Sequence, residues 1–173
     1  AVQVAASQGN PCAEHPGPSA VFDGMTRPAG RRDQDLCLTH GQGVNANGST
    51  PTPTPGTVRC WGDNASGDLG DGTTTRRLTP VHVTGIANAT QITAGGWHTC
   101  ALLTDRTVRC WGSNWPGELG DGTTTNRVTP VQVTGIANAT QITAGSQHTC
   151  ALLTDGTVRC WGSNWPGELG DGT

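Results

Sequence analysis

The stretch that decides the fold is QITAGSQHTCALLTDGTVRCWGSNWPGELGDGT, residues 141–173, because it recurs almost unchanged 50 residues earlier. Over the longer windows 73–123 and 123–173, the two copies differ at six paired positions, namely Arg76/Asn126, Leu78/Val128, His82/Gln132, Gly96/Ser146, Trp97/Gln147 and Arg106/Gly156. Self-similarity at a fixed period of about 20 to 50 residues is typical of repeat architectures. The chain is therefore expected to repeat one structural unit.

Within one copy, the run from Thr129 to Gly162 predicts four short strands separated by turn signals, at 130–134, 141–144, 148–153 and 158–161. Four strands in a repeat of about 40 to 50 residues indicate a propeller blade, because one small sheet cannot bury both faces alone. Few charged (13%) and aromatic (4%) residues, with 26 Gly and 11 Pro, also favour short strands and tight turns. The expected class is all-β, with four-stranded antiparallel blades.

The TDG turn at 154–156 predicts a three-residue hairpin loop with Gly156 in the left-handed conformation. That register places Cys150 opposite Cys160, and opposed strand residues have Cα atoms about 4.5 to 5.5 Å apart, a separation that a disulfide spans. The earlier copy has Arg106 in place of the turn glycine. A strained left-handed position or a slightly different hairpin is expected there.

The chain has seven cysteines, and their spacing predicts cross-strand disulfides of the kind found in oxidising compartments, with the pairs Cys100/Cys110 and Cys150/Cys160. Cys60 is expected to pair with one of two earlier residues. Aligning QVAASQGNPCA (3–13) over residues 141–151 makes Cys12 its partner, whereas a strand at DLCLT (35–39) makes it Cys37. Both alternatives interrupt the first blade with a long excursion.

The repeated string resembles the bacterial form of the regulator of chromosome condensation repeat, with its glycine-His-Thr strand, DG turn, strand ending in WG and N..G.LG.G segment. The resemblance covers residues 56–173. It implies a seven-bladed propeller around a central channel, with partners bound through loops on the two faces. Seven blades of this period would need about twice this chain, so the chain is expected to be a fragment that packs against the remaining blades of its parent.

The expected organisation is a partial propeller of about three blades. Its predicted parts are an irregular first blade with a long Pro/Gly-rich insertion (1–59), a second blade (60–112), a third blade (113–162) and the start of a truncated next repeat (163–173).

No arrangement of residues predicts catalysis, so the protein is not expected to be an enzyme. His98 and His148 occupy the same repeat position, which favours a structural hydrogen bond within each sheet. A metal site built from His98, Cys100 and Cys110 would lack a fourth ligand. No metal and no cofactor is expected. The sequons at Asn47, Asn64, Asn88 and Asn138 would matter only in a eukaryotic secretory host.

Candidate binding residues are aromatic or differ between copies. Tryptophans at the WG positions, Trp61, Trp111 and Trp161, are expected to pack blades together. Trp115 and Trp165 lie in the SNWPGELG loop, either as wedges between blades or facing a ligand. Among the differing positions, those that recognition could use are Trp97, Gln147, His82 and Gln132.

The formal net charge is −3 and the cationic residues are scattered arginines, which disfavours nucleic acid as a direct partner. No apolar run is long enough to span a membrane. We expect a non-enzymatic protein-binding scaffold that is secreted or attached to the cell surface. One alternative is nucleotide exchange with chromatin binding, as in eukaryotic members of the resembled family, and another is carbohydrate binding through Trp115 and Trp165.

Overall fold

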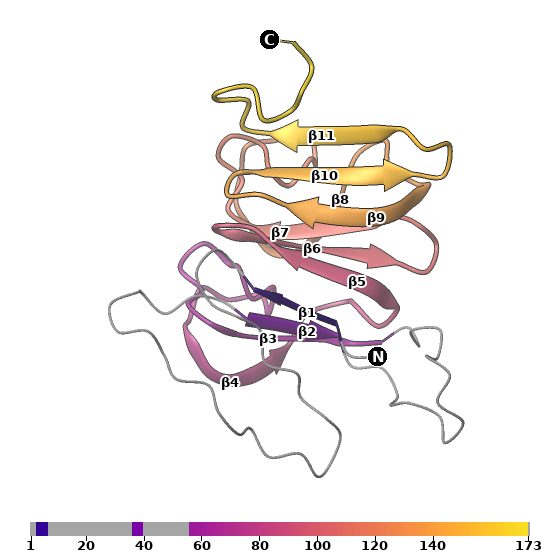
Figure 1. The fold of residues 1–173 in the computed structure, drawn as a ribbon. Coiled ribbons are helices and arrows are strands. Elements are labelled where there is room, and N and C mark those ends of the chain that lie inside the picture. The colour runs from indigo at the N-terminus through magenta and orange to yellow at the C-terminus, as the bar shows by residue number, and fades with distance from the viewer. Residues whose placement is uncertain (1–2, 7–35, 40–55, 173) are drawn as a thin grey trace, which may run out of the picture.

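A computed structural model describes residues 3–6, 36–39 and 56–172, and the regular elements in these ranges are all β-strands. Three antiparallel sheets follow one another along the chain (Figure 1). The first contains β1 (Gln3–Ala6), β2 (Leu36–Thr39), β3 (Val58–Gly62) and β4 (Arg77–His82). The second contains β5 (Ala89–Ala94), β6 (His98–Leu103), β7 (Val108–Gly112) and β8 (Arg127–Gln132). The third contains β9 (Ala139–Ala144), β10 (His148–Leu153) and β11 (Val158–Gly162).

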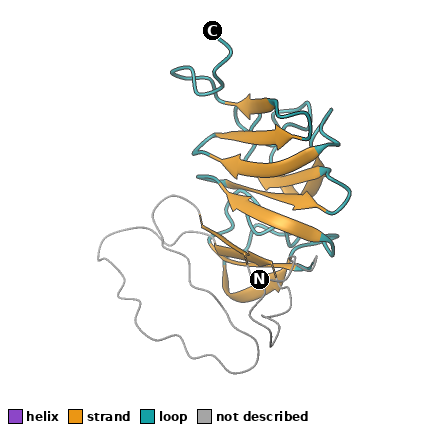
Figure 2. Ribbon diagram, turned by 45° about the vertical axis from the view of Figure 1, so that its right-hand side comes forward, coloured by secondary structure: helices purple, strands orange, loops and turns teal. Residues whose placement is uncertain are grey.

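The sheets stack face to face, because β5 contacts β1 and β2 while β9 contacts β5 and β6 (Figure 2). We call the contact between the first and second sheets the first seam, and that between the second and third sheets the second seam. Each seam is lined by an apolar cluster, with Leu69, Ile92 and Trp111 in the first and Leu119, Ile142 and Ala151 in the second. The fold is all-β, as expected, and its units are blades of a propeller.

The strand grouping differs from the one expected between Thr129 and Gly162. All four expected strands exist, but the first of them, β8, pairs with β7 and completes the second sheet. The second sheet therefore takes strands from both sides of the expected boundary between residues 112 and 113. A periodic sequence defines the repeat but not its starting point, and here the loop at 113–126 returns the chain to the strand it has just left.

The β10–β11 hairpin has the predicted register, with Gly156 at φ 83°. The β6–β7 hairpin is the same turn, so the expectation of a different hairpin at Arg106 is wrong. Arg106 takes the left-handed conformation at φ 66°, and its N–H donates to the Leu103 carbonyl at 3.0 Å, as that of Gly156 does to Leu153. The register of the two flanking strands forces Arg106 into the left-handed conformation, which glycine adopts more readily.

Two disulfides join the hairpin strands, Cys100 to Cys110 and Cys150 to Cys160. Cys60 is also in a disulfide, and the β2–β3 register sets Cys37 opposite it, as Cys100 is opposite Cys110. This register fits the Cys37 alternative, while Cys12 lies outside the described residues. The β1 strand nevertheless comes from the segment that the other alternative aligned, so the first sheet combines parts of both.

The third sheet has an open edge within the described residues. In the second sheet Val108 is fully buried and its carbonyl accepts from the Val133 N–H at 2.9 Å, whereas the equivalent Val158 on β11 is 62% exposed. The described sheets therefore form only part of a propeller.

Candidate interaction surface

The loop between β7 and β8 is built around the buried side chain of Asn114. Its amide nitrogen donates to Asp121 Oδ1 and to the carbonyls of Thr123 and Thr125, at 3.0 to 3.1 Å, and its Oδ1 accepts from the Leu119 N–H at 3.0 Å. One side chain thus provides hydrogen-bond partners for backbone groups that are not paired with a neighbouring strand. The loop is ordered from within and needs no ligand to shape it.

The tip of this loop is a tight turn closed by the Gly117 N–H donating to the Asn114 carbonyl at 2.8 Å. The two central positions of the turn are Trp115 and Pro116, both exposed. The third repeat has a turn at the corresponding place, closed from Gly167 to Asn164 at 2.7 Å, but its Trp165–Pro166 peptide bond is cis, whereas Trp115–Pro116 is trans. In the first repeat, the tryptophan position holds Ala65.

Trp115 and Trp165 therefore stand at the tips of equivalent loops, where their side chains are 74% and 85% exposed. Trp115 is exposed although the third sheet is packed beside its own. For Trp115 the alternative of a wedge between blades is wrong, because its side chain stays exposed beside the third sheet, and the tryptophan packed between the second and third sheets is Trp161. We call Trp97, Trp115 and Trp165 the tryptophan face.

Trp97 joins this face from the β5–β6 turn and is 47% exposed. Its carbonyl accepts from the Ser113 N–H at 2.8 Å, which fixes the turn against the start of the loop that carries Trp115. The equivalent turn of the third sheet carries exposed Gln147, and the two turns touch because the Gly96 N–H donates to the Ser146 carbonyl at 2.9 Å. A Cβ at position 96 would lie 2.8 Å from that carbonyl oxygen, so the change from glycine to serine there has a packing cause.

The other two candidates lie elsewhere. His82 and Gln132 are exposed at the ends of the outer strands β4 and β8, opposite Arg59 and Arg109. The loop with Trp115 joins β7 and β8 at the other end of the sheet. The structure therefore brings Trp97, Gln147, Trp115 and Trp165 to one face and leaves His82 and Gln132 near the opposite end.

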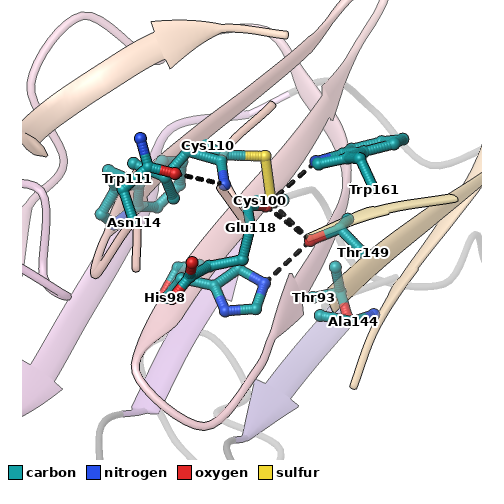
Figure 3. The surroundings of a disulfide bond; sticks show 12 residues. Thr93, His98, Cys100, Cys110, Trp111, Asn114, Glu118, Ala144, Thr149 and Trp161 are labelled. Atoms are coloured by element: carbon teal, nitrogen blue, oxygen red, sulfur yellow. Dashed lines mark hydrogen bonds between the residues drawn. A yellow bond between two sulfur atoms is a disulfide. The ribbon is translucent and has the colours of Figure 1, made fainter. Parts of the chain in front are cut away.

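The same pair of hydrogen bonds recurs in both seams: one backbone carbonyl accepts from a tryptophan indole and from a threonine hydroxyl. In the first seam, the Asp68 carbonyl accepts from Trp111 Nε1 at 2.8 Å and from Thr99 Oγ1 at 3.1 Å. In the second seam, the Glu118 carbonyl accepts from Trp161 Nε1 and Thr149 Oγ1, both at 3.0 Å (Figure 3). The indole of each WG pair thus packs on the loop of the preceding sheet, as a blade-packing role requires.

His98 is 1% exposed, and its Nε2 lies 2.8 Å from Thr149 Oγ1 (Figure 3). Since the single hydroxyl proton of Thr149 is donated to the Glu118 carbonyl, His98 Nε2 must be the donor to Thr149 and Nδ1 carries the lone pair. Burial, and secondarily the neighbouring His148, lower the pKa of His98 to about 4. The expectation of a bond within one sheet is wrong, because this bond crosses the second seam.

In the first seam, burial shifts the pKa of Asp68 upward, whereas it shifts that of His98 downward. Its side chain is 1% exposed, Oδ2 accepts from the Ser66 N–H at 3.2 Å, and Oδ1 has no hydrogen-bond partner among the described residues. Burial raises the pKa of this carboxyl from 3.8 to about 7 against the backbone hydrogen bonds that lower it. In the second repeat the residue is Glu118, whose longer side chain reaches the Gly117 N–H at 3.1 Å.

Sequence reasoning missed two structural residues in these loops. Asn64 and Asn114 are fully buried organisers of the turns that carry the loop tips, and the signal available was an asparagine at a fixed distance before the repeated glycines. Asp71 and Asp121 each precede a turn glycine. They also form ion pairs at 2.7 Å, with Arg77 and Arg127.

The described part of the chain contains no group of three or more His, Cys, Asp or Glu side chains placed to hold a metal ion. The two cysteines of the alternative metal site are joined to each other. Among the same residues, no helix has the length and apolar character needed to cross a membrane.

Comparison with solved structures finds propellers. The human protein WBSCR16 matches with a TM-score of 0.58 at 18% identity, over 78% of this chain and 32% of that one. Yeast RCC1 (Prp20), solved in complex with Kap60, matches with a TM-score of 0.53 at 17% identity, over 76% and 40%. A second structure of Prp20p from Saccharomyces cerevisiae gives 0.54 at 18%, over 76% and 41%. The chain thus spans less than half the length of each.

The search of curated proteins gives no match. Two family models do match, both described as the regulator of chromosome condensation (RCC1) repeat, at residues 55–102 and 139–164. The segment 55–102 contains β3, β4 and β5, and the segment 139–164 contains the third sheet with Trp161 of the second seam. The chain therefore contains RCC1 repeats, folded as part of a propeller of that kind.

Proposed function

We propose that this protein is a non-enzymatic scaffold that binds another protein through the tryptophan face. The observation that carries the proposal is the exposure of Trp115 and Trp165 at the tips of two equivalent loops, 74% and 85%. Large apolar side chains are usually withdrawn from water unless they have a partner. These two lie at the corresponding loop tips of consecutive repeats.

The mechanism of binding follows from the rigidity of the loops. Tryptophan is enriched among the residues that dominate binding energy at protein interfaces. A loop held by the hydrogen bonds of Asn114, with the Asp121–Arg127 ion pair beside it, loses little conformational freedom when a partner docks. The indoles are therefore offered in a fixed arrangement, and most of their burial contributes to affinity.

A protein partner is favoured by two further observations. Yeast RCC1, which has the same fold, was crystallised bound to the protein Kap60. The net charge of −3 provides no basic surface for nucleic acid. The disulfides of the second and third sheets support a location outside the reducing cytosol, either secreted or at the cell surface.

The experiment compares baits that differ only in surface residues. Immobilised wild-type protein and the double variant Trp115→Ala/Trp165→Ala are incubated with secreted and surface proteins from the source organism, and captured proteins are quantified by mass spectrometry. The matched control is Val158→Ala, because Val158 is 62% exposed at the start of β11, beside the β10–β11 hairpin and at the end of the sheet opposite the loop tips. We expect specific captures to disappear with the double variant and to persist with the control. Captures that survive the double variant would contradict the proposal.

A second candidate is carbohydrate binding, favoured by the same two exposed indoles, since an indole face stacks on the apolar face of a sugar ring. Titration of neutral oligosaccharides, followed by tryptophan fluorescence, tests it. A spectral shift that saturates in the wild type and is absent from Trp115→Ala/Trp165→Ala would favour a glycan. Lack of any shift would leave the protein partner.

A further inference from the structure

Each seam contains one buried titratable side chain with an unpaired atom. In the first seam it is Asp68, whose Oδ1 has no hydrogen-bond partner among the described residues. In the second it is His98, whose Nδ1 has none either. Nδ1 of His148, the equivalent residue on the third sheet, is a third such atom. Asp68 and His98 are both 1% exposed. Buried polar atoms without partners are rare, so their presence between stacked sheets requires an account.

The surroundings of Asp68 favour its neutral form. On its own loop the charged neighbour is Asp63, which disfavours a second negative charge and raises the pKa of Asp68. Across the seam, a Cβ at Gly112 would lie 2.9 Å from Asp68 Oδ1 and equally close to the Cα of His98, so backbone faces the carboxyl there. The His98 ring is bonded to Thr149 on the third sheet and does not pair with it. No cation in the described part of the seam compensates a charge on Asp68.

The surroundings of His98 also favour its neutral form. The titratable neighbour on the facing sheet is His148, whose positive charge would repel an imidazolium and lowers the pKa of His98. From the loop packed against that sheet, Glu118 presents its carbonyl to Thr149 and its Oε2 to the Gly117 N–H. Protonation would place a donor at Nδ1 where no acceptor lies.

We infer that the two seams respond to pH in opposite directions, so that acidification tightens the first seam and loosens the second. This inference goes beyond the proposed function and does not depend on it. The first seam buries a group that is neutral when protonated, and the second buries a group that is neutral when deprotonated. A fall in pH therefore stabilises the closed first seam and destabilises the closed second seam.

The direction follows from comparing each closed seam with its opened state. For Asp68 the closed-state pKa is about 7 and the ordinary value 3.8, so its stabilising contribution is present below about pH 4 and is lost as pH rises to 7. For His98 the closed-state pKa is about 4 and the ordinary value 6.5. Its contribution is present above pH 6.5 and is lost as pH falls toward 4. Between pH 4 and 6.5 the two trends oppose each other.

This opposition has a consequence for the tryptophan face. Trp97 and Trp115 belong to the second sheet and Trp165 follows the third, so the second seam sets their relative position. At acidic pH the distance between the loop tips of Trp115 and Trp165 therefore becomes more variable, and at neutral pH the closed second seam keeps it constant.

Hydrogen exchange of two equivalent loops provides the test. The loop at 63–72 reports the first seam and the loop at 113–122 reports the second, in one sample of the full chain with disulfides intact. Rates at pH 5 and pH 8 are corrected for the intrinsic pH dependence of exchange. In the wild type we expect protection of 63–72 to fall by up to about a hundredfold from pH 5 to pH 8, and protection of 113–122 to rise by up to about thirtyfold.

Two variants assign the responses to their residues. Asp68→Asn should abolish the pH response of 63–72 and leave that of 113–122, whereas His98→Gln, which retains a donor for Thr149, should do the reverse. Asp68→Glu, which copies the second repeat, serves if Asp68→Asn is unstable and should reduce the response at 63–72. A response of the same sign in both wild-type loops would overturn the inference, as would an unchanged response at 63–72 in Asp68→Asn or Asp68→Glu.

Discussion

A single methyl group at Gly70 is expected to damage the first seam. A Cβ there would lie 2.8 Å from both Cδ1 and Nε1 of Trp111. Trp111 is fully buried and its Nε1 donates to the Asp68 carbonyl, so the ring cannot withdraw without losing that hydrogen bond. Gly85 is the matched control, because its φ of 71° is close to the 67° of Gly70 while a Cβ there meets nothing within 4 Å.

Gly70→Ala and Gly85→Ala both place alanine in the left-handed conformation, but only Gly70→Ala also overpacks an indole ring. Alanine in the left-handed conformation costs about 1 kcal/mol at either site. At Gly70 the overpacking of a fixed indole adds about 1 to 3 kcal/mol. Gly85→Ala should therefore lower the free energy of unfolding by about 1 kcal/mol, and Gly70→Ala by about 2 to 4 kcal/mol. Gly120→Ala should fall between them, because its clash is with Trp161, which is only partly buried.

Guanidinium chloride unfolding of the oxidised protein, followed by tryptophan fluorescence, gives these free energies by linear extrapolation. Equal losses for Gly70→Ala and Gly85→Ala would refute the reasoning. That result would mean that the indole of Trp111 does not pack against the loop of the preceding sheet, and the described seam would be incorrect.

Three further predictions concern the hairpins and the loop. Arg106→Gly should raise the free energy of unfolding by about 1 kcal/mol in denaturant titrations, and Gly156→Arg should lower it by a similar amount, because both positions require the left-handed conformation; no change in either variant would contradict this. Limited reduction followed by alkylation and mass mapping should label Cys150 and Cys160 before Cys100 and Cys110, which are fully buried, and simultaneous labelling would argue against the described burial. Asn114→Ala should lower the thermal midpoint, at a cost of roughly 3 kcal/mol from unpaired backbone groups, while the exposed Asn126, which accepts one bond from the Asn114 N–H, should lose less than about 1 kcal/mol on changing to alanine.

Much of the fold could be predicted because the repeat is almost exact. The TDG turn sets the hairpin register, and that register alone aligns Cys150 with Cys160. Turn signals separated the four short strands of the repeat. These features depend on neighbours within about 25 residues, where sequence pattern and turn geometry are sufficient.

The errors concern contacts between repeats. A period of 50 residues does not say whether β8 joins the sheet before it or after it, and the choice is made by pairing with β7. Likewise, His98 and Thr149 meet only when two sheets stack, so a bond within one sheet was the natural prediction. At Arg106 the strands flanking the turn overrode the local preference for glycine.

The candidate surface was predicted only in part. Trp115 and Trp165 were identified by their repetition, but sequence alone left them between wedge and surface, because the loop that turns them outward depends on the buried side chain of Asn114. His82 and Gln132 shared the variability of Trp97 without sharing its location.

The division of tryptophans between the seams and the surface is the central claim, and hydroxyl-radical footprinting of the oxidised protein with mass spectrometry tests it most directly. Oxidation rates should follow exposure, with Trp165 and Trp115 fastest, Trp97 slower and the fully buried Trp111 protected. Protection of Trp115 to the level of Trp111 would contradict the account, because it would return this residue to the space between blades and remove the surface on which the proposed function depends.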